Sequence, residues 1–157
     1  MEFVLWACKS CHLFGIILLL GSYLFQSGIL YPVAKVEGEE QGKLILHFEK
    51  RFVPFIWLSL WTILLTGILL ALLNPKFEWF QFSTTWQILL ALKELVFMFI
   101  FFFSVGYIRM YRLLEKVVNA SEKEDFAVDV LLEKMKKFRT LNVYLSIVAI
   151  LLVAGMR

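Results

Sequence analysis

The sequence predicts an all-α integral membrane protein, built as a bundle of four membrane-spanning helices. Hydrophobic residues make up 61% of the 157 residues, and the mean hydropathy is +0.78. Four long apolar stretches stand out, at residues 12–34, 52–74, 86–108 and 140–156. Because charged residues are confined to short blocks between them, we expect a single transmembrane domain over residues 1–157.

The four stretches differ in length. The first three meet the roughly 20 residues that a helix needs to cross the hydrocarbon core, and residues 140–156 are near the lower limit but contain no charge. The first stretch is longer than the apolar part of a signal peptide and has no charged leader before it, so we expect it to be retained.

Lysine and arginine are distributed unevenly among the connections. The segment after the first stretch carries four of them, Lys35, Lys43, Lys50 and Arg51, and the segment after the third carries eight, Arg109, Arg112, Lys116, Lys123, Lys134, Lys136, Lys137 and Arg139. The second connection has only Lys76, and the N-terminal segment only Lys9. The positive-inside rule then places both termini on the outer side of the cell membrane (N-out, C-out).

The segment before the fourth stretch has a pattern of its own. Ser121 and Glu124 have the spacing of a capping box, and apolar residues follow at helical spacing, namely Val128, Leu131, Leu132, Met135 and Phe138. This predicts an amphipathic helix on the cytoplasmic membrane surface. The net charge of +3 comes from these connections, which argues against a nucleic-acid partner.

Polar residues within the apolar stretches indicate which faces point into the bundle. One face of the first stretch carries His12, Gly15, Leu19, Ser22 and Gln26 at alternating spacings of three and four. Ser59, Thr62 and Thr66 form a similar face in the second. Helix packing is the simplest interpretation for the small residues and the hydroxyls.

The third stretch contains Lys93 and Glu94, about two turns inside its outer end. Adjacent residues point about 100° apart on a helix, so the two side chains are not expected to neutralise one another. Lys93 either extends toward the membrane surface or has a functional role, since ionisable groups at this depth are rare and are usually functional.

The most specific motif is Cys8-Lys9-Ser10-Cys11-His12, the C-x-x-C-H pattern of c-type haem attachment. In that chemistry two thiols add to the vinyl groups of one porphyrin, and the adjacent imidazole binds the iron. The predicted topology places Cys8 on the outer face, where such attachment takes place. Non-covalent (b-type) haem on His12 and a packing face, disulfide or other metal site are the alternatives.

Two further residues are candidates for the sixth iron position. Lys93 can ligate iron as a neutral amine or, when charged, pair with a haem propionate. Met156 lies at the outer end of the fourth stretch, level with His12. His47, the other histidine, is expected in a solvated loop at the opposite end, too far away to share an iron with His12.

The chain resembles the copper-resistance D (CopD)/HemJ-type superfamily of four-helix membrane proteins. The matching features are His12, Tyr31-Pro32, Glu49-Lys50-Arg51, Pro54, Gly67, Trp86, Leu92-Lys93 and Asn142. For a HemJ-type member the resemblance implies haem binding by His12, dependence on Lys93 and oxidation of protoporphyrinogen IX. For a CopD-type member it implies copper handling.

The chain departs from the HemJ-type pattern in three ways. It adds Cys8 and Cys11, it lacks the histidine that usually follows the Tyr-Pro stretch, and it carries Glu94. The first two departures argue against the oxidase activity, and the added cysteines favour a permanently held haem.

Four functions are therefore compared. The leading hypothesis is electron transfer by a membrane-embedded cytochrome near the outer face, with quinol or a redox protein as its partner. The alternatives are a protoporphyrinogen oxidase, a copper-handling membrane protein, and a subunit of a larger respiratory complex or homo-oligomer.

Overall fold

The structure, a computed structural model, describes residues 2–36, 41–73, 84–119 and 125–155. Its elements are α1 (Glu2–Phe25), a π-helical turn η1 (Gln26–Leu30), α2 (Tyr31–Val36), α3 (Gln41–Leu72), α4 (Thr85–Asn119) and α5 (Asp125–Ala154). The described residues contain no strand. The predicted all-α class is confirmed.

Four of the helical segments are long and apolar enough to cross a membrane: Glu2–Val33, Lys43–Leu72, Thr85–Asn119 and Ala127–Ala154. Large apolar side chains are exposed along each of them, for example Phe14, Leu65, Phe102 and Leu151. Exposed apolar surface on every side of a bundle is what contact with lipid requires. The chain is a multi-pass membrane protein.

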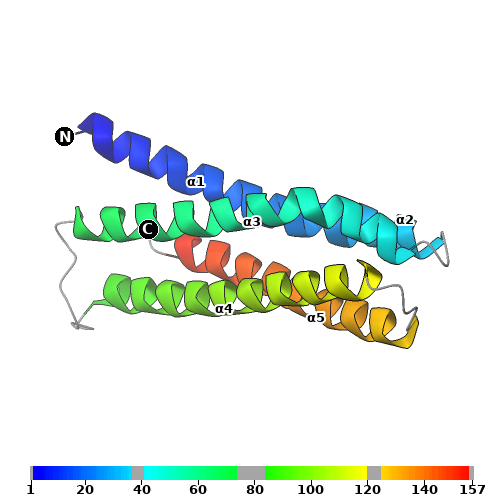
Figure 1. Cartoon of the computed structure of the whole chain (residues 1–157). Coiled ribbons are helices and arrows are strands. Elements are labelled where there is room, and N and C mark those ends of the chain that lie inside the picture. Colours follow the sequence, from blue (N-terminus) through cyan, green and yellow to red (C-terminus); the bar gives the residue numbers. More distant parts are fainter. Residues whose placement is uncertain (1, 37–40, 74–83, 120–124, 156–157) are drawn as a thin grey trace.

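The bundle consists of two antiparallel helix pairs. α1 packs mainly against α3, α4 packs mainly against α5, and the two pairs meet chiefly through α3 and α4 and through α1 and α5 (Figure 1). Both chain termini lie at one end of the bundle, which we call the termini end (Figure 1). At the other end, the opposite end, α2 is followed by α3 and α4 by α5. An even number of crossings accounts for this arrangement.

Two local features explain where helices bend and begin. The run from α1 to α2 is continuous through η1, where the Tyr31 N–H donates to the Gln26 carbonyl. Pro32 has no N–H and cannot make the next α-helical bond, so a wider turn before it is favourable. α4 begins with a capping box: the Thr84 N–H donates to Gln87 Oε1 (3.1 Å), and the Gln87 N–H to Thr84 Oγ1 (3.3 Å).

The helices extend beyond the apolar stretches and include most of the charged blocks. The amphipathic segment 128–138 is helical as predicted, but it is continuous with the last span in α5. No proline or glycine separates the two in the sequence, so nothing interrupts the helix there. The predicted capping residues Ser121 and Glu124 lie outside the described residues.

Packing is uneven along the bundle. The buried hydrophobic side chains belong to the middle and the opposite end, from Leu19 onward in α1, up to Ile63 in α3 and from Val96 onward in α4. Toward the termini end, beyond these residues and beyond Ser146 in α5, none of the described hydrophobic side chains is buried. The candidate site lies in this loosely packed part.

Candidate functional site

The polar face predicted for the first span points into the bundle. Gly15, Leu19 and Ser22 are buried within α1, and Gln26 is buried in η1. At Gly15 the backbones approach closely, because an added Cβ would lie only 2.9 Å from Ile63 Cγ1 of α3. This contact fixes α1 against α3 one turn after His12.

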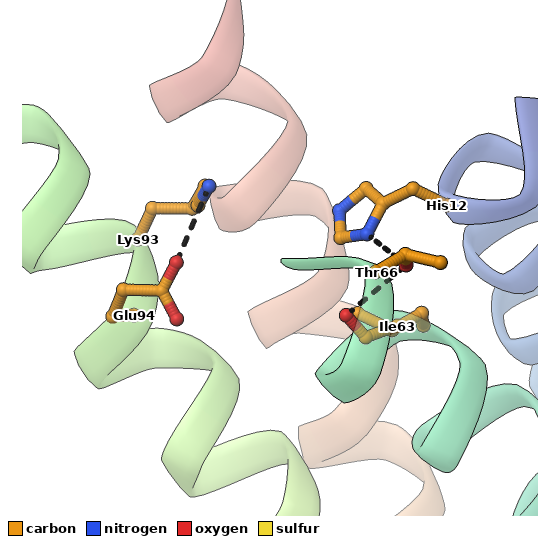
Figure 2. Close-up of polar contacts among 5 residues, drawn as sticks. All are labelled: His12, Ile63, Thr66, Lys93 and Glu94. Carbon is orange, nitrogen blue, oxygen red and sulfur yellow. Dashed lines mark hydrogen bonds and ion pairs between the residues drawn. The ribbon is translucent and has the colours of Figure 1, made fainter. Parts of the chain in front are cut away.

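His12 is half-buried and faces α3. Its Nδ1 lies 2.8 Å from the Thr66 hydroxyl oxygen (Figure 2), and its Cε1 would be 3.4 Å from a Cβ on Gly67. Thr66 was predicted to lie on an inward face, and it does. The pairing with His12 was not predicted, because the two residues are 54 positions apart.

The hydrogen bonds of Thr66 determine which nitrogen of His12 carries the proton. The Thr66 hydroxyl has one proton, and it donates to the backbone carbonyls of Thr62 (2.5 Å) and, more weakly, Ile63 (3.4 Å). Its oxygen must therefore accept from His12 Nδ1–H. Nε2 is then unprotonated and keeps its lone pair, which is the state of a metal-ligating imidazole oriented by a second hydrogen bond.

Lys93 of α4 faces the same space. In Figure 2 its ammonium group points toward His12, with α5 behind the space between them, and the two side chains interact electrostatically. Lys93 Nζ also lies 3.4 Å from Glu94 Oε1, so the prediction that these neighbours would not pair is wrong. Both side chains are flexible enough to curve around the helix, and Glu94 is half-exposed.

The two cysteines lie on the first turns of α1. Cys8 is seven residues before Gly15 and Cys11 is four before it, so both belong to the face that packs against α3 farther along. Cys8 is partly buried, Cys11 is exposed, and both are free thiols. The C-x-x-C-H motif is therefore displayed on a helix, with its thiols accessible and its imidazole directed inward.

The other histidine and the candidate methionine ligand do not join His12 in the described residues. His47 is exposed on α3 near the opposite end and is far from His12 as predicted, but it lies in a helix rather than a loop. Met156 lies outside the described residues. Among the residues that are described, no three His, Cys, Asp or Glu side chains come together to hold a metal ion.

A second polar cluster lies in the half of the bundle nearer the opposite end and was not predicted. Glu49 of α3 is fully buried; its Oε1 accepts from the Tyr107 hydroxyl at 2.5 Å, and Gln26 Nε2 donates to its Oε2 at 3.4 Å. The Tyr107 hydroxyl also lies 3.0 Å from Gln26 Oε1. We call these three side chains the Glu49 ring. Beside it, Tyr23 donates to Ser104 (2.8 Å).

Arg139 of α5 is also buried, which corrects its prediction as an inner-face charge. Its exposed fraction is only 2%, its Nε donates to Ser27 Oγ (2.9 Å), and its guanidinium stacks on the Tyr31 ring with the carbon 3.5 Å from the ring centroid. Its Nη1 has no hydrogen-bond partner. Arg139 and Glu49 form no ion pair, although both are described and lie close enough to interact electrostatically.

The spacing of polar residues in the sequence could have indicated this buried cluster. Ser104 and Tyr107 are three apart, as are Arg139 and Asn142, and each pair marks one face of a helix. Glu49 and Arg139 were assigned to connections because they stand beside exposed basic residues.

Comparisons with family models, with curated proteins and with solved structures found no match.

Proposed function

We propose that the chain is a membrane-embedded haem protein that transfers electrons, with the haem held at the termini end by His12. The observation that carries this proposal is the orientation of His12. Thr66 accepts from Nδ1, which leaves the Nε2 lone pair free to bind iron. A bound haem would supply a one-electron redox centre within the bilayer.

Two further observations support the location. The termini end lacks buried hydrophobic side chains among the described residues, over at least two turns of each helix. Proteins normally pack their interiors densely, so a loosely packed end beside an oriented imidazole fits a bulky apolar cofactor. Lys93 faces this space and would serve as the sixth ligand or as the partner of a propionate.

Covalent attachment through Cys8 and Cys11 is the form that we favour. Both thiols are free, they share a helix face with His12 next to them, and neither is fully buried. In covalent attachment the two cysteines bond to the vinyl groups of the porphyrin, and only the histidine binds the iron. The absence of a three-ligand metal cluster among the described residues therefore does not conflict with covalent attachment. This form places the termini end outside the cell membrane, with quinol or a redox protein as the partner.

The mass and spectrum of the purified protein test the proposal. We expect a visible Soret band, a denatured polypeptide heavier than its sequence by one haem, and loss of the added mass in the Cys8→Ser, Cys11→Ser double variant. A red native protein of unmodified mass would establish b-type binding instead. A colourless protein after expression with haem supply would refute the haem proposal, and bound copper would favour the copper-handling alternative.

Protoporphyrinogen oxidation is the second candidate. The HemJ-type resemblance implies that His12 binds haem and that the activity depends on Lys93. The positions of these two residues favour this candidate, because both face the same space between the helices (Figure 2). Turnover of protoporphyrinogen IX that is lost in both His12→Ala and Lys93→Met would support it. Haem binding without turnover would leave electron transfer as the function.

A further inference from the structure

The Glu49 ring contains three oxygen–oxygen or nitrogen–oxygen contacts, and each needs one proton. They join Tyr107 to Glu49 Oε1 (2.5 Å), Tyr107 to Gln26 Oε1 (3.0 Å), and Gln26 Nε2 to Glu49 Oε2 (3.4 Å). The tyrosine hydroxyl supplies one proton, and the amide supplies one, because only its nitrogen side carries hydrogen. Two protons make three hydrogen bonds only if the Tyr107 proton is shared between two acceptors.

The third proton has one available source, which is Glu49 itself. If Glu49 is a carboxylic acid, its Oε1–H donates to the Tyr107 oxygen, Tyr107 donates to Gln26 Oε1, and Gln26 Nε2 donates back to Glu49 Oε2. The ring is then closed and every contact is satisfied. If Glu49 is ionised, the Tyr107 proton must be shared between Glu49 and Gln26, or, with the amide oxygen and nitrogen of Gln26 exchanged, two acceptor oxygens lie 3.4 Å apart.

The surroundings of Glu49 agree with a neutral acid. The side chain is fully buried, and an ionised carboxylate without an ion-pair partner is costly in a protein interior. Arg139, the nearby cation, is held instead by Ser27 and the face of the Tyr31 ring. The titratable or charged groups that interact with Glu49 come from all the elements around it: Tyr23, Tyr31, Tyr107, Tyr111 and Arg139.

Buried polar atoms without a partner lie beside the ring, at Tyr31 Oη and Arg139 Nη1, and farther along toward the termini end. On the side of the opposite end, buried and mostly apolar residues close the interior, namely Ile45, Tyr111, Leu114, Leu132 and Met135. Toward the termini end, Asn142 donates to the Tyr23 hydroxyl (3.2 Å), while Asn142 Oδ1 and Ser146 Oγ are buried without a partner. Buried atoms of this kind are commonly satisfied by ordered water, which conducts protons.

We propose that Glu49 is a buried proton-binding site, whose acid form is closed into a ring with Tyr107 and Gln26 and exchanges its proton toward the termini end past Asn142 and Ser146. On release the proton leaves Glu49 Oε1 for water, and the carboxylate that remains is balanced by Arg139. The site does not depend on the haem proposal, since its residues and its geometry are separate from His12.

Infrared spectroscopy of the purified chain in lipid nanodiscs tests this directly. At neutral pH we expect a carboxylic-acid C=O band that shifts in D₂O, is absent in Glu49→Gln and is retained in the matched control Glu94→Gln. Ionised carboxylate bands alone, or an acid band that persists in Glu49→Gln, would overturn the proposal. Should Glu49→Gln fail to fold, Tyr107→Phe must keep the acid band at a higher frequency, because the acid loses its acceptor.

Stability and exchange give two independent readouts. Glu49→Gln should unfold at the same midpoint as the parent chain, since its amide supplies the third proton, whereas Glu49→Leu should unfold earlier. An equal loss in both variants would mean that the negative charge is required. Asn142→Leu should slow deuterium exchange of the acid band several-fold and Met135→Leu should leave it unchanged. Equal exchange in Asn142→Leu and the parent chain would overturn the direction of exchange.

Discussion

Replacing Gly15 with alanine places a methyl group in the closest contact between α1 and α3. The new Cβ would lie 2.9 Å from Ile63 Cγ1 and 3.4 Å from both the Ser59 carbonyl oxygen and Thr62 Cγ2. Ile63 is β-branched and has one strongly preferred rotamer in a helix, so its Cγ1 cannot swing away freely. The two helices must therefore separate.

The cost can be isolated with a matched control. Overpacking of this kind costs about 1–3 kcal/mol, and alanine is favoured over glycine within a helix by about 1 kcal/mol. Gly21 lies on the same helix, with nothing within 4 Å of an added Cβ. Gly21→Ala should therefore be neutral or slightly stabilising, and the difference between the two variants should be the steric term, about 1–3 kcal/mol.

Unfolding of each variant by SDS in mixed micelles, followed by circular dichroism, measures this difference. We expect Gly15→Ala to unfold at a lower SDS fraction than the parent chain and Gly21→Ala at the same or a higher one. Equal midpoints for the two variants would refute the close approach of α1 and α3. A Gly15→Ala variant that is more stable than Gly21→Ala would refute it more strongly.

Three other predictions follow from the site and the topology. Thr66→Val leaves His12 Nδ1–H without its acceptor and should destabilise the fold by about 1–3 kcal/mol, whereas Thr66→Ser should not; similar unfolding midpoints would contradict the tautomer assignment. Labelling of intact cells should mark a cysteine probe introduced near Lys76 but not one near Lys123, and the reverse would invert the topology. Lys93→Met should change the Soret band and spin state of the haem protein while Met156→Leu should not; the opposite outcome would identify Met156 as the sixth ligand.

The helical spans and their inward faces were predictable because both follow from local pattern. Apolar length identifies a span, and the spacing of Gly15, Leu19, Ser22 and Gln26 identified the buried face of α1 before any partner was known. The helix ends were less predictable. Charged residues beyond the apolar stretches continue in α3, α4 and α5, and hydropathy marks where a membrane would end rather than where a helix does.

The contacts of the candidate site could not be predicted from one sequence. His12 meets Thr66 across 54 positions and Tyr107 meets Glu49 across 58, and no local pattern encodes such distances. Glu49 and Arg139 were assigned to charged connections for a related reason. Each stands beside exposed basic residues, so both were expected to be exposed as well. Whether a single side chain is buried depends instead on the direction in which it points from its helix.

The pairing of α1 with α3 and of α4 with α5 has a consequence for how the chain assembles during synthesis. Each pair consists of spans that are consecutive in the sequence, so each can associate soon after its second span enters the bilayer. The Glu49 ring cannot close at that stage: Glu49 and Gln26 belong to the first pair, while Tyr107 arrives with the second. Until then Glu49 lacks its tyrosine partner, and the docking of the two helix pairs is the step that completes the Glu49 ring.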